Sequence, residues 1–171
     1  MKRLTTLSAA TFVLLVVSSN WLTSEFGLVG GFVTAGTFTA GLTLVARDAV
    51  REVAGVWVSL ACVAAGVAIS AWMAGPALAL ASGVAFAASE LADTAVYEPL
   101  RRRSRTRALA WSNLVGSVVD SALFLALAGF PIWPAVAGQI IVKWAVCVAL
   151  PLLALGVARA VLRNRLRPEG A

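Results

Sequence analysis

Long apolar stretches alternate with short polar loops along the whole chain. A helix needs about 20 mainly apolar residues to cross the hydrocarbon core of a bilayer. By this measure the pattern predicts six spanning helices, at residues 4–21, 27–46, 55–74, 77–97, 109–130 and 135–158. These segments account for most of the 171 residues. We therefore expect an all-α integral membrane protein with a single six-helix domain, residues 1–171.

The basic residues predict how this domain is oriented. All Lys and Arg residues except Lys143 lie at the two ends of the chain or in the second and fourth loops, and the other three loops have none. Cytoplasmic loops carry the excess of Lys and Arg. We therefore expect a multi-pass protein of the cytoplasmic membrane with both termini in the cytoplasm. The main alternative, four spans and two re-entrant segments, would put some basic loops on the wrong side.

Composition narrows the range of functions. Hydrophobic residues make up 60% of the chain and charged residues 13%, about half the charged fraction of a soluble domain. The net charge of +6 and the run RRRSRTR at 101–107 are features of nucleic-acid-binding proteins. The basic residues lie in loops and at the chain ends, however, where they fit a role in setting the orientation of the membrane helices better. We expect the bilayer, and no nucleic acid, as a partner. Cys62 and Cys147 lie in apolar segments without histidine, so neither a disulfide, a metal site nor a cofactor is indicated.

The second predicted span and the loop after it contrast sharply in polarity. Thr34, Thr37 and Gly41 share one helical face, which is typical of close packing between membrane helices, although one or two of them could face a ligand. Four charged residues follow, and we expect them to form a loop or an amphipathic turn that caps the helix rather than a catalytic cluster: Arg47, Asp48, Arg51 and Glu52.

The last three predicted spans carry polar residues in a repeated pattern. The fourth span has Phe86, Glu90, Asp93 and Tyr97 at helical spacing, the fifth has Asn113, Ser117, Asp120 and Phe124 at the same spacing, and the sixth has Gln139, Lys143 and Cys147. In each span these residues share one face of the helix. Polar and charged faces of this kind are not expected to contact lipid.

The depth of the charges indicates a functional cavity. Glu90, Asp120 and Lys143 fall near the middle of a core about 30 Å thick, and Asp93 lies closer to the cytoplasm. Each buried charge costs about 2.5–3.5 kcal/mol on insertion scales. With three acids and one base in the spans, two carboxylates lack a cationic partner. They must be protonated, hydrated in a cavity, or satisfied by a ligand.

The neutral polar and aromatic residues suggest what kind of ligand this is. Amides both donate and accept hydrogen bonds, carboxylates accept them, and aromatic rings stack on flat molecules. A neutral heterocycle fits this set better than a metal ion, since the chain has no histidine. The candidate substrate-binding residues are Asn20, Phe38, Glu90, Asp93, Asn113, Asp120, Gln139 and Lys143.

Several motifs, in order, resemble one family. They are SSNWL (18–22), GTFTAGLTLVARDAVREVAG (36–55), SELADTAVYEPLRRR (89–103), SNLVGSVVDSALF (112–124) and GQIIVKW (138–144). Together they resemble the queuosine precursor transporters, also catalogued as the VUT or putative vitamin uptake transporter family. The resemblance implies a fold akin to the substrate-binding components of energy-coupling-factor transporters. It also implies import of 7-deazaguanine bases, such as 7-cyano-7-deazaguanine, for tRNA modification.

The same resemblance implies which residues bind the substrate. The matching positions are Asn20, Glu90, Asp93, Asn113, Asp120, Gln139 and Lys143. Glu90 departs from the family pattern, because a glutamine can occupy its place in relatives.

Other functions remain open from the residues alone. One alternative is a transporter of another vitamin-like heterocycle, or of a small cation, coupled to protons. We expect no enzyme activity, because the sequence has no histidine and no nucleophile with an evident base. The sequence lacks a G-x-x-x-x-G-K-[ST] motif, so the chain itself is not expected to hydrolyse ATP. An energising module or a second copy of the chain are possible partners.

Overall fold

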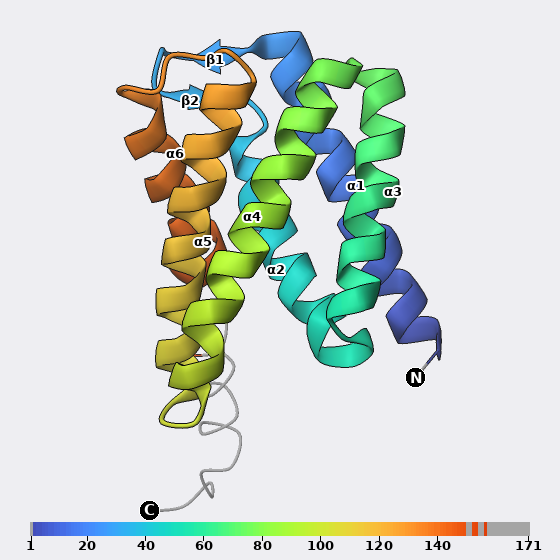
Figure 1. Cartoon of the computed structure of the whole chain (residues 1–171), viewed down its shortest axis with the longest axis vertical. Helices are drawn as coiled ribbons and strands as arrows, with labels where there is room; N and C mark the ends of the chain where they lie inside the picture. Colours follow the sequence, from blue (N-terminus) through green and yellow to red (C-terminus); the bar gives the residue numbers. More distant parts are fainter. Residues whose placement is uncertain (1, 150–151, 154–155, 157–171) are drawn as a thin grey trace, which may run out of the picture.

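A computed structural model describes residues 2–149, 152, 153 and 156, and these residues are almost entirely helical (Figure 1). The elements are α1 (Lys2–Phe26), β1 (Leu28–Val29), β2 (Val33–Thr34), α2 (Thr37–Ala54), α3 (Val56–Met73), α4 (Pro76–Arg101), α5 (Arg105–Leu127), α6 (Ala135–Trp144) and a π-helical turn η1 (Ala145–Ala149). The two short strands pair antiparallel, with Leu28 opposite Thr34. The prediction of an all-α membrane protein is confirmed.

Four of the helices are long and apolar enough to cross a membrane: α1, α3, α4 and α5. The continuous helix Ala135–Ala149 is apolar but shorter. Many large apolar side chains point outward, for example Trp57, Trp72 and Leu91, which are 80%, 88% and 75% exposed. An apolar exterior of this kind suits lipid rather than water. The chain is a multi-pass membrane protein.

The second predicted span is wrong in its position. Residues 28–34 form a β-hairpin, and α2 begins only at Thr37. The reason is backbone geometry, because Gly27, Gly30 and Gly31 have φ angles of 56°, 61° and 77°, which a right-handed helix cannot contain. The hydropathy of the segment conceals this break. Since α2 continues to Ala54, the charged stretch expected in a loop is part of a helix.

The other predicted boundaries differ less. Helix α3 agrees closely with the third span, and a turn at Gly75, with φ 92°, leads into Pro76 at the start of α4. Helices α4 and α5 extend into the basic run, so only residues 102–104 connect them. Ser104 Oγ accepts a hydrogen bond from the Arg107 backbone N–H at 3.4 Å and caps α5. The predicted sixth span is described as α6 and η1. Pro151, a residue type that can kink a helix, lies outside the described residues.

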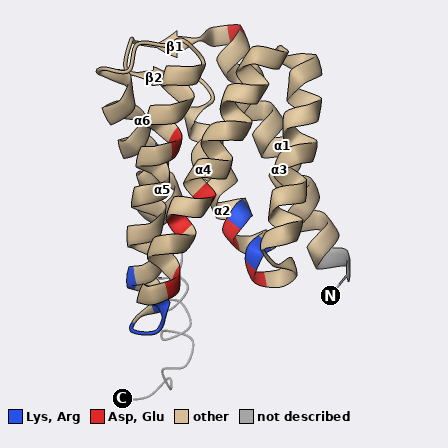
Figure 2. Cartoon of the chain, in the orientation of Figure 1, with Lys and Arg blue, Asp and Glu red and all other residues tan. Residues whose placement is uncertain are grey.

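Helix α2 is surrounded by the other helices. It packs against α1, α3, α6 and η1, while α4 and α5 form the most extensive helix pair of the fold. The main apolar core lies between these elements and includes Phe12, Leu44, Val63, Phe86 and Val148. Figure 1 shows the hairpin and the α3–α4 turn at one end of the molecule, and the α2–α3 and α4–α5 connections at the other. Lys and Arg residues are concentrated toward this second end, the basic end (Figure 2).

Candidate functional site

A buried network of charges joins α2 to α4 and α5. We call it the arginine–carboxylate cluster, and it consists of Arg47, Asp48, Arg51, Glu90, Asp93 and Asn113. Arg47 is fully buried. Its Nε and Nη2 donate to Asp48 Oδ1 at 2.9 and 2.7 Å. Nη2 also donates to Asn113 Oδ1 at 3.0 Å and to Asp93 Oδ1 at 3.3 Å.

The second arginine of the cluster lies one turn further along α2. Arg51 Nη1 donates to Glu90 Oε1 at 3.2 Å and to Asp93 Oδ2 at 3.1 Å. Its Nη2 donates to Thr94 Oγ1 at 3.0 Å, and its guanidinium lies 5.7 Å from the centre of the Tyr97 ring. Both arginines therefore hold α2 to α4 by charge-assisted hydrogen bonds, which are stronger than neutral ones.

The cluster is not balanced in charge or in hydrogen bonding. Three carboxylates face two guanidinium groups, so the cluster carries one excess negative charge when all are ionised. Arg47 Nη1 and Glu90 Oε2 are 3.3 Å apart, but the geometry between them gives neither atom a hydrogen bond. Unpaired buried polar atoms of this kind are rare and costly.

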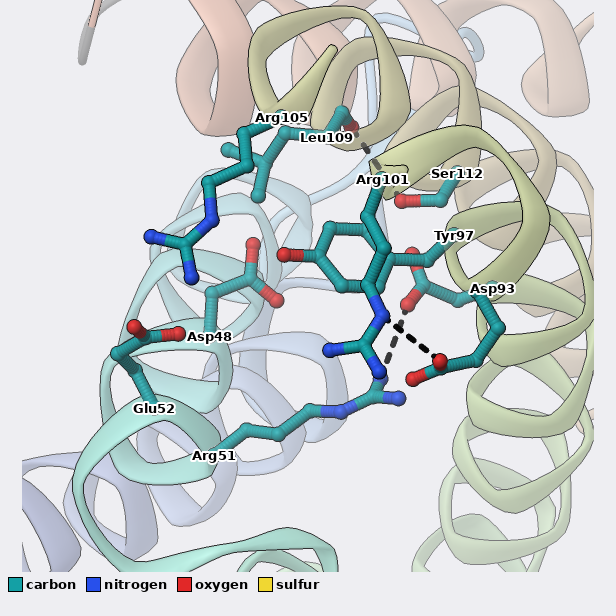
Figure 3. A pocket seen from close by; sticks show the side chains of 10 residues that line it. Asp48, Arg51, Glu52, Asp93, Tyr97, Arg101, Arg105, Leu109 and Ser112 are labelled. Atoms are coloured by element: carbon teal, nitrogen blue, oxygen red, sulfur yellow. Dashed lines mark hydrogen bonds and ion pairs between the residues drawn. The ribbon is translucent and has the colours of Figure 1, made fainter. Parts of the chain in front are cut away.

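A pocket of about 160 Å³ reaches this cluster from the basic end (Figure 3). Asp48, Arg51 and Asp93 line it together with Tyr97, and Arg101 and Arg105 lie around it. Its walls therefore mix basic, acidic and aromatic side chains. We call it the basic-end pocket.

A second polar site lies closer to the hairpin end and is centred on Lys143 of α6. Lys143 Nζ donates to Asp120 Oδ2 at 2.6 Å, to Ser121 Oγ at 3.0 Å and to Gln139 Oε1 at 3.3 Å. These bonds use all three N–H donors of the ammonium group. The lysine is only 3% exposed, and pairing with Asp120 offsets the cost of burying its charge.

Lys143 forms part of the wall of a small cavity, which we call the lysine cavity. The side chains that line it are mostly hydroxyls and amides, with one aromatic ring: Ser19, Asn20, Thr23, Thr34, Thr37, Ser82, Phe124, Gln139 and Lys143. Gln139 Nε2 donates to Thr34 Oγ1 at 3.2 Å, and Asn20 Nδ2 donates to Ser70 Oγ at 3.0 Å. The free space is about 30 Å³, enough for a water molecule.

The eight residues predicted to bind substrate occupy four different places. Asn20, Gln139 and Lys143 line the lysine cavity, and Asp120 lies behind Lys143 as its ion-pair partner. The arginine–carboxylate cluster holds three more: Glu90, Asp93 and Asn113. Phe38 lies on the outside, 53% exposed. The structure therefore does not bring the eight residues into one cavity.

The predicted deficit of cations in the spans is wrong. Arg47 and Arg51 supply the positive charges that Glu90 and Asp93 require. The expectation that the charged stretch 47–52 forms a loop or capping turn is also wrong for Arg47, which is fully buried within α2.

A signal in the sequence could have identified these arginines. Thr37, Gly41 and Leu44 share a buried face of α2, and continuing the same helical spacing leads to Arg47 and Arg51. Thr37 and Gly41 of the face noted in the sequence therefore continue into the charged stretch as one face of α2, whereas Thr34 lies in β2.

The geometry can be compared with known proteins. A family model described as putative vitamin uptake transporter matches residues 70–157, slightly more than half of the chain. The match covers α4, α5 and α6, and thus the part of each polar site that these helices contribute, whereas the residues from α1, the hairpin and α2 lie outside it. The comparisons with curated proteins and with solved structures gave no match. The family resemblance seen in the sequence is confirmed: the chain belongs to the vitamin uptake transporter family.

Proposed function

We propose that the protein imports a 7-deazaguanine base, a precursor of queuosine such as 7-cyano-7-deazaguanine, across the cytoplasmic membrane. The observation that carries this proposal is the lysine cavity. An ammonium group, two amides, threonine hydroxyls and one aromatic ring converge in a buried space inside a membrane protein. The known family supports transport as the activity, and the choice of cargo rests on the chemistry of these groups.

The cavity offers a partner for each polar edge of such a base. A guanine-like base presents a ring carbonyl next to N–H donors. Lys143 Nζ can donate to the carbonyl in place of one of its three present acceptors. Asp120, which lies behind Lys143 at 2.6 Å from Nζ, can accept from the N–H groups once the cavity has widened. Gln139 and Asn20 can both donate and accept, and Phe124 can stack on the ring. A ligand without these donors would leave a buried carboxylate poorly paired, which is a strong source of specificity.

The cavity must widen before a base can enter. Its free space of about 30 Å³ is far smaller than a purine. Helix α2 also packs closely against the segment that follows α6, because a Cβ on Gly41 would lie only 2.8 Å from Val146 of η1. The π-helical turn η1 directly follows α6, and such turns often occur at functional sites. We expect α6 to shift relative to α2 when the cargo binds.

We also propose six crossings, with both termini in the cytoplasm. The connections between α2 and α3 and between α4 and α5 lie at the same end of the molecule (Figure 1). Both lie beside arginines, whereas the hairpin end has none in its loops. On this proposal the basic end, and with it the basic-end pocket, lies on the cytoplasmic side, because cytoplasmic loops carry the excess of Lys and Arg.

Ligand binding to purified protein in detergent tests the proposed cargo. We expect 7-cyano-7-deazaguanine to raise the melting temperature, and adenine to have no effect. At about 100 times the Kd, binding adds about 2.7 kcal/mol of stability. The double variant Lys143→Met/Asp120→Asn removes both charges of the pair together and should abolish the shift, while the exposed Glu25→Gln should keep it. Absence of a shift from folded wild-type protein would contradict the proposed cargo and favour a different heterocycle.

A further inference from the structure

The arginine–carboxylate cluster carries a net charge of −1 when all its groups are ionised, and binding of a cargo in the lysine cavity does not account for this charge. None of its charged residues lines that cavity. The three carboxylates of the cluster also accept different numbers of hydrogen bonds. Asp48 accepts three hydrogen bonds, from Arg47 and Asn113, and each oxygen of Asp93 accepts one. Glu90 accepts only one, at 3.2 Å on Oε1, and its buried Oε2 has no hydrogen-bond partner.

We propose that Glu90 is a proton-binding site that couples cargo movement to a proton gradient. Adding one proton converts the Glu90 carboxylate to a neutral carboxylic acid, and the net charge of the cluster changes from −1 to zero. The carboxylate with the fewest donors loses least when it is protonated, because fewer hydrogen bonds favour its charged form. This inference rests on the proposed transport function and adds its energy source.

The surroundings of Glu90 favour a proton over a metal ion. Arg47, Arg51 and Asp48 face it from α2, and Asp93 faces it from α4. Asn113 of α5 is uncharged, and η1 contributes the buried thiol of Cys147. Arg47 Nη1 lies 3.3 Å from the unpaired oxygen and would repel a metal cation at this position. Among the described residues, no group of acidic, cysteine or histidine side chains could hold a metal ion.

The basic-end pocket gives this proton a route. Asp48, Arg51 and Asp93, which belong to the cluster, line the pocket, so water in it reaches Arg51, the hydrogen-bond donor to Glu90. If the basic end is cytoplasmic, the structure shows the arrangement from which a proton leaves toward the cytoplasm. The ion pairs to both arginines are then those of the deprotonated state.

Two helices connect the proton site to the lysine cavity. On α2, Thr37 lines the cavity, and Arg51 lies about 20 Å further along the same helix. On α5, Asn113 of the cluster and Asp120 of the cavity are about 10 Å apart along the axis. Protonation of Glu90 removes its attraction to Arg47 and Arg51 and so loosens α2 from α4. A loosened α2 permits the widening that the cargo requires.

Transport by protein reconstituted into liposomes tests the coupling. The probe is radiolabelled 7-cyano-7-deazaguanine, with the membrane potential held at zero by valinomycin and equal potassium. At one proton per cargo, a gradient of about one pH unit sustains about tenfold accumulation. We expect wild type and the exposed control Glu25→Gln to approach this ratio. In Glu90→Gln, the ratio of accumulation with and without the gradient should fall to about one. The proposal would be overturned if accumulation by wild type did not depend on the pH gradient. It would also be overturned if Glu90→Gln kept the wild-type ratio of accumulation with and without the gradient.

A second measurement does not depend on the cargo. In a pH titration followed by infrared difference spectroscopy, a buried carboxylic acid gives a C=O band that shifts in heavy water. We expect such a band in wild type and in Glu25→Gln, and its loss in Glu90→Gln. If wild type exchanges no labelled base at equal pH but shows this band, the proposed cargo fails and the proton site stands. If the band is absent from wild type, the proton site fails whatever the cargo.

Discussion

Removal of Arg47 is the most direct test of the arginine–carboxylate cluster. Arg47→Met keeps an unbranched side chain but removes the guanidinium group, which leaves Asp48 without its ion-pair partner and Glu90 and Asp93 with Arg51 alone. The net charge of the cluster changes from −1 to −2. Removing one partner of a buried ion pair costs about 3–5 kcal/mol. At about 2–4 °C per kcal/mol for a chain of this size, the melting temperature should fall by about 6–20 °C.

The assay uses cysteines that the chain already has. Cys62 and Cys147 are both buried free thiols, so a maleimide dye that fluoresces on reaction reports their exposure as the protein unfolds in detergent. Arg103→Met, at an exposed arginine of the basic end, is the matched control and should change stability by less than about 0.5 kcal/mol.

A double variant separates charge from packing. Arg47→Met/Glu90→Gln returns the net charge of the cluster to −1 and should recover about 1–3 kcal/mol of the loss. If Arg47→Met melts within about 2 °C of wild type, the buried ion pairs do not hold α2 in place. If Glu90→Gln gives no recovery, the loss reflects the missing volume rather than the uncompensated carboxylates.

Three further predictions follow from particular residues. Gly36→Ala should lower the melting temperature by an amount equivalent to about 1–3 kcal/mol, because the new Cβ would lie 2.0 Å from a carbonyl oxygen of α1. Gly116→Ala should be tolerated, because its nearest neighbouring atom would be 3.6 Å away. Phe124→Ala should weaken binding of the deazaguanine in a thermal-shift titration at least tenfold, and Phe38→Ala, on the outside of the bundle, should leave it unchanged. In a background without the native cysteines, Ser104→Cys should react with an impermeant maleimide only after the cells are opened, and labelling of intact cells would contradict the proposed orientation.

The sequence predicted most of the helices because their signal is local. Hydropathy located α1, α3, α4 and α5, and helical spacing placed Glu90 with Asp93 on one face and Gln139 with Lys143 on another. The hairpin at 28–34 could not be found in this way, because its residues are as apolar as a spanning helix. Only the positive φ angles of its glycines interrupt the helix, and hydropathy does not register them.

The division into two polar sites could not be predicted for a different reason. It depends on which helix faces which, and helix spacing gives only the face of each helix. Asp120 and Glu90 look alike in sequence, each an acid on a spanning helix. In the fold, Asp120 forms an ion pair with Lys143, while Glu90 forms ion pairs with Arg47 and Arg51. Because the stretch that holds Arg47 and Arg51 was predicted to form a loop or a turn, two of the three acids in the spans were expected to lack a cationic partner.

The way in which α2 is held suggests which part of the protein moves. Helices α4 and α5 are the most extensively packed pair, and separating them would open apolar cavities at a high cost. Helix α2 instead contacts α4 and α5 largely through the long side chains of Arg47 and Arg51. Such ion pairs depend on the charge of the cluster, so one proton at Glu90 weakens them without leaving an apolar void. We therefore expect transport to proceed by movement of α2 against a fixed α4–α5 pair.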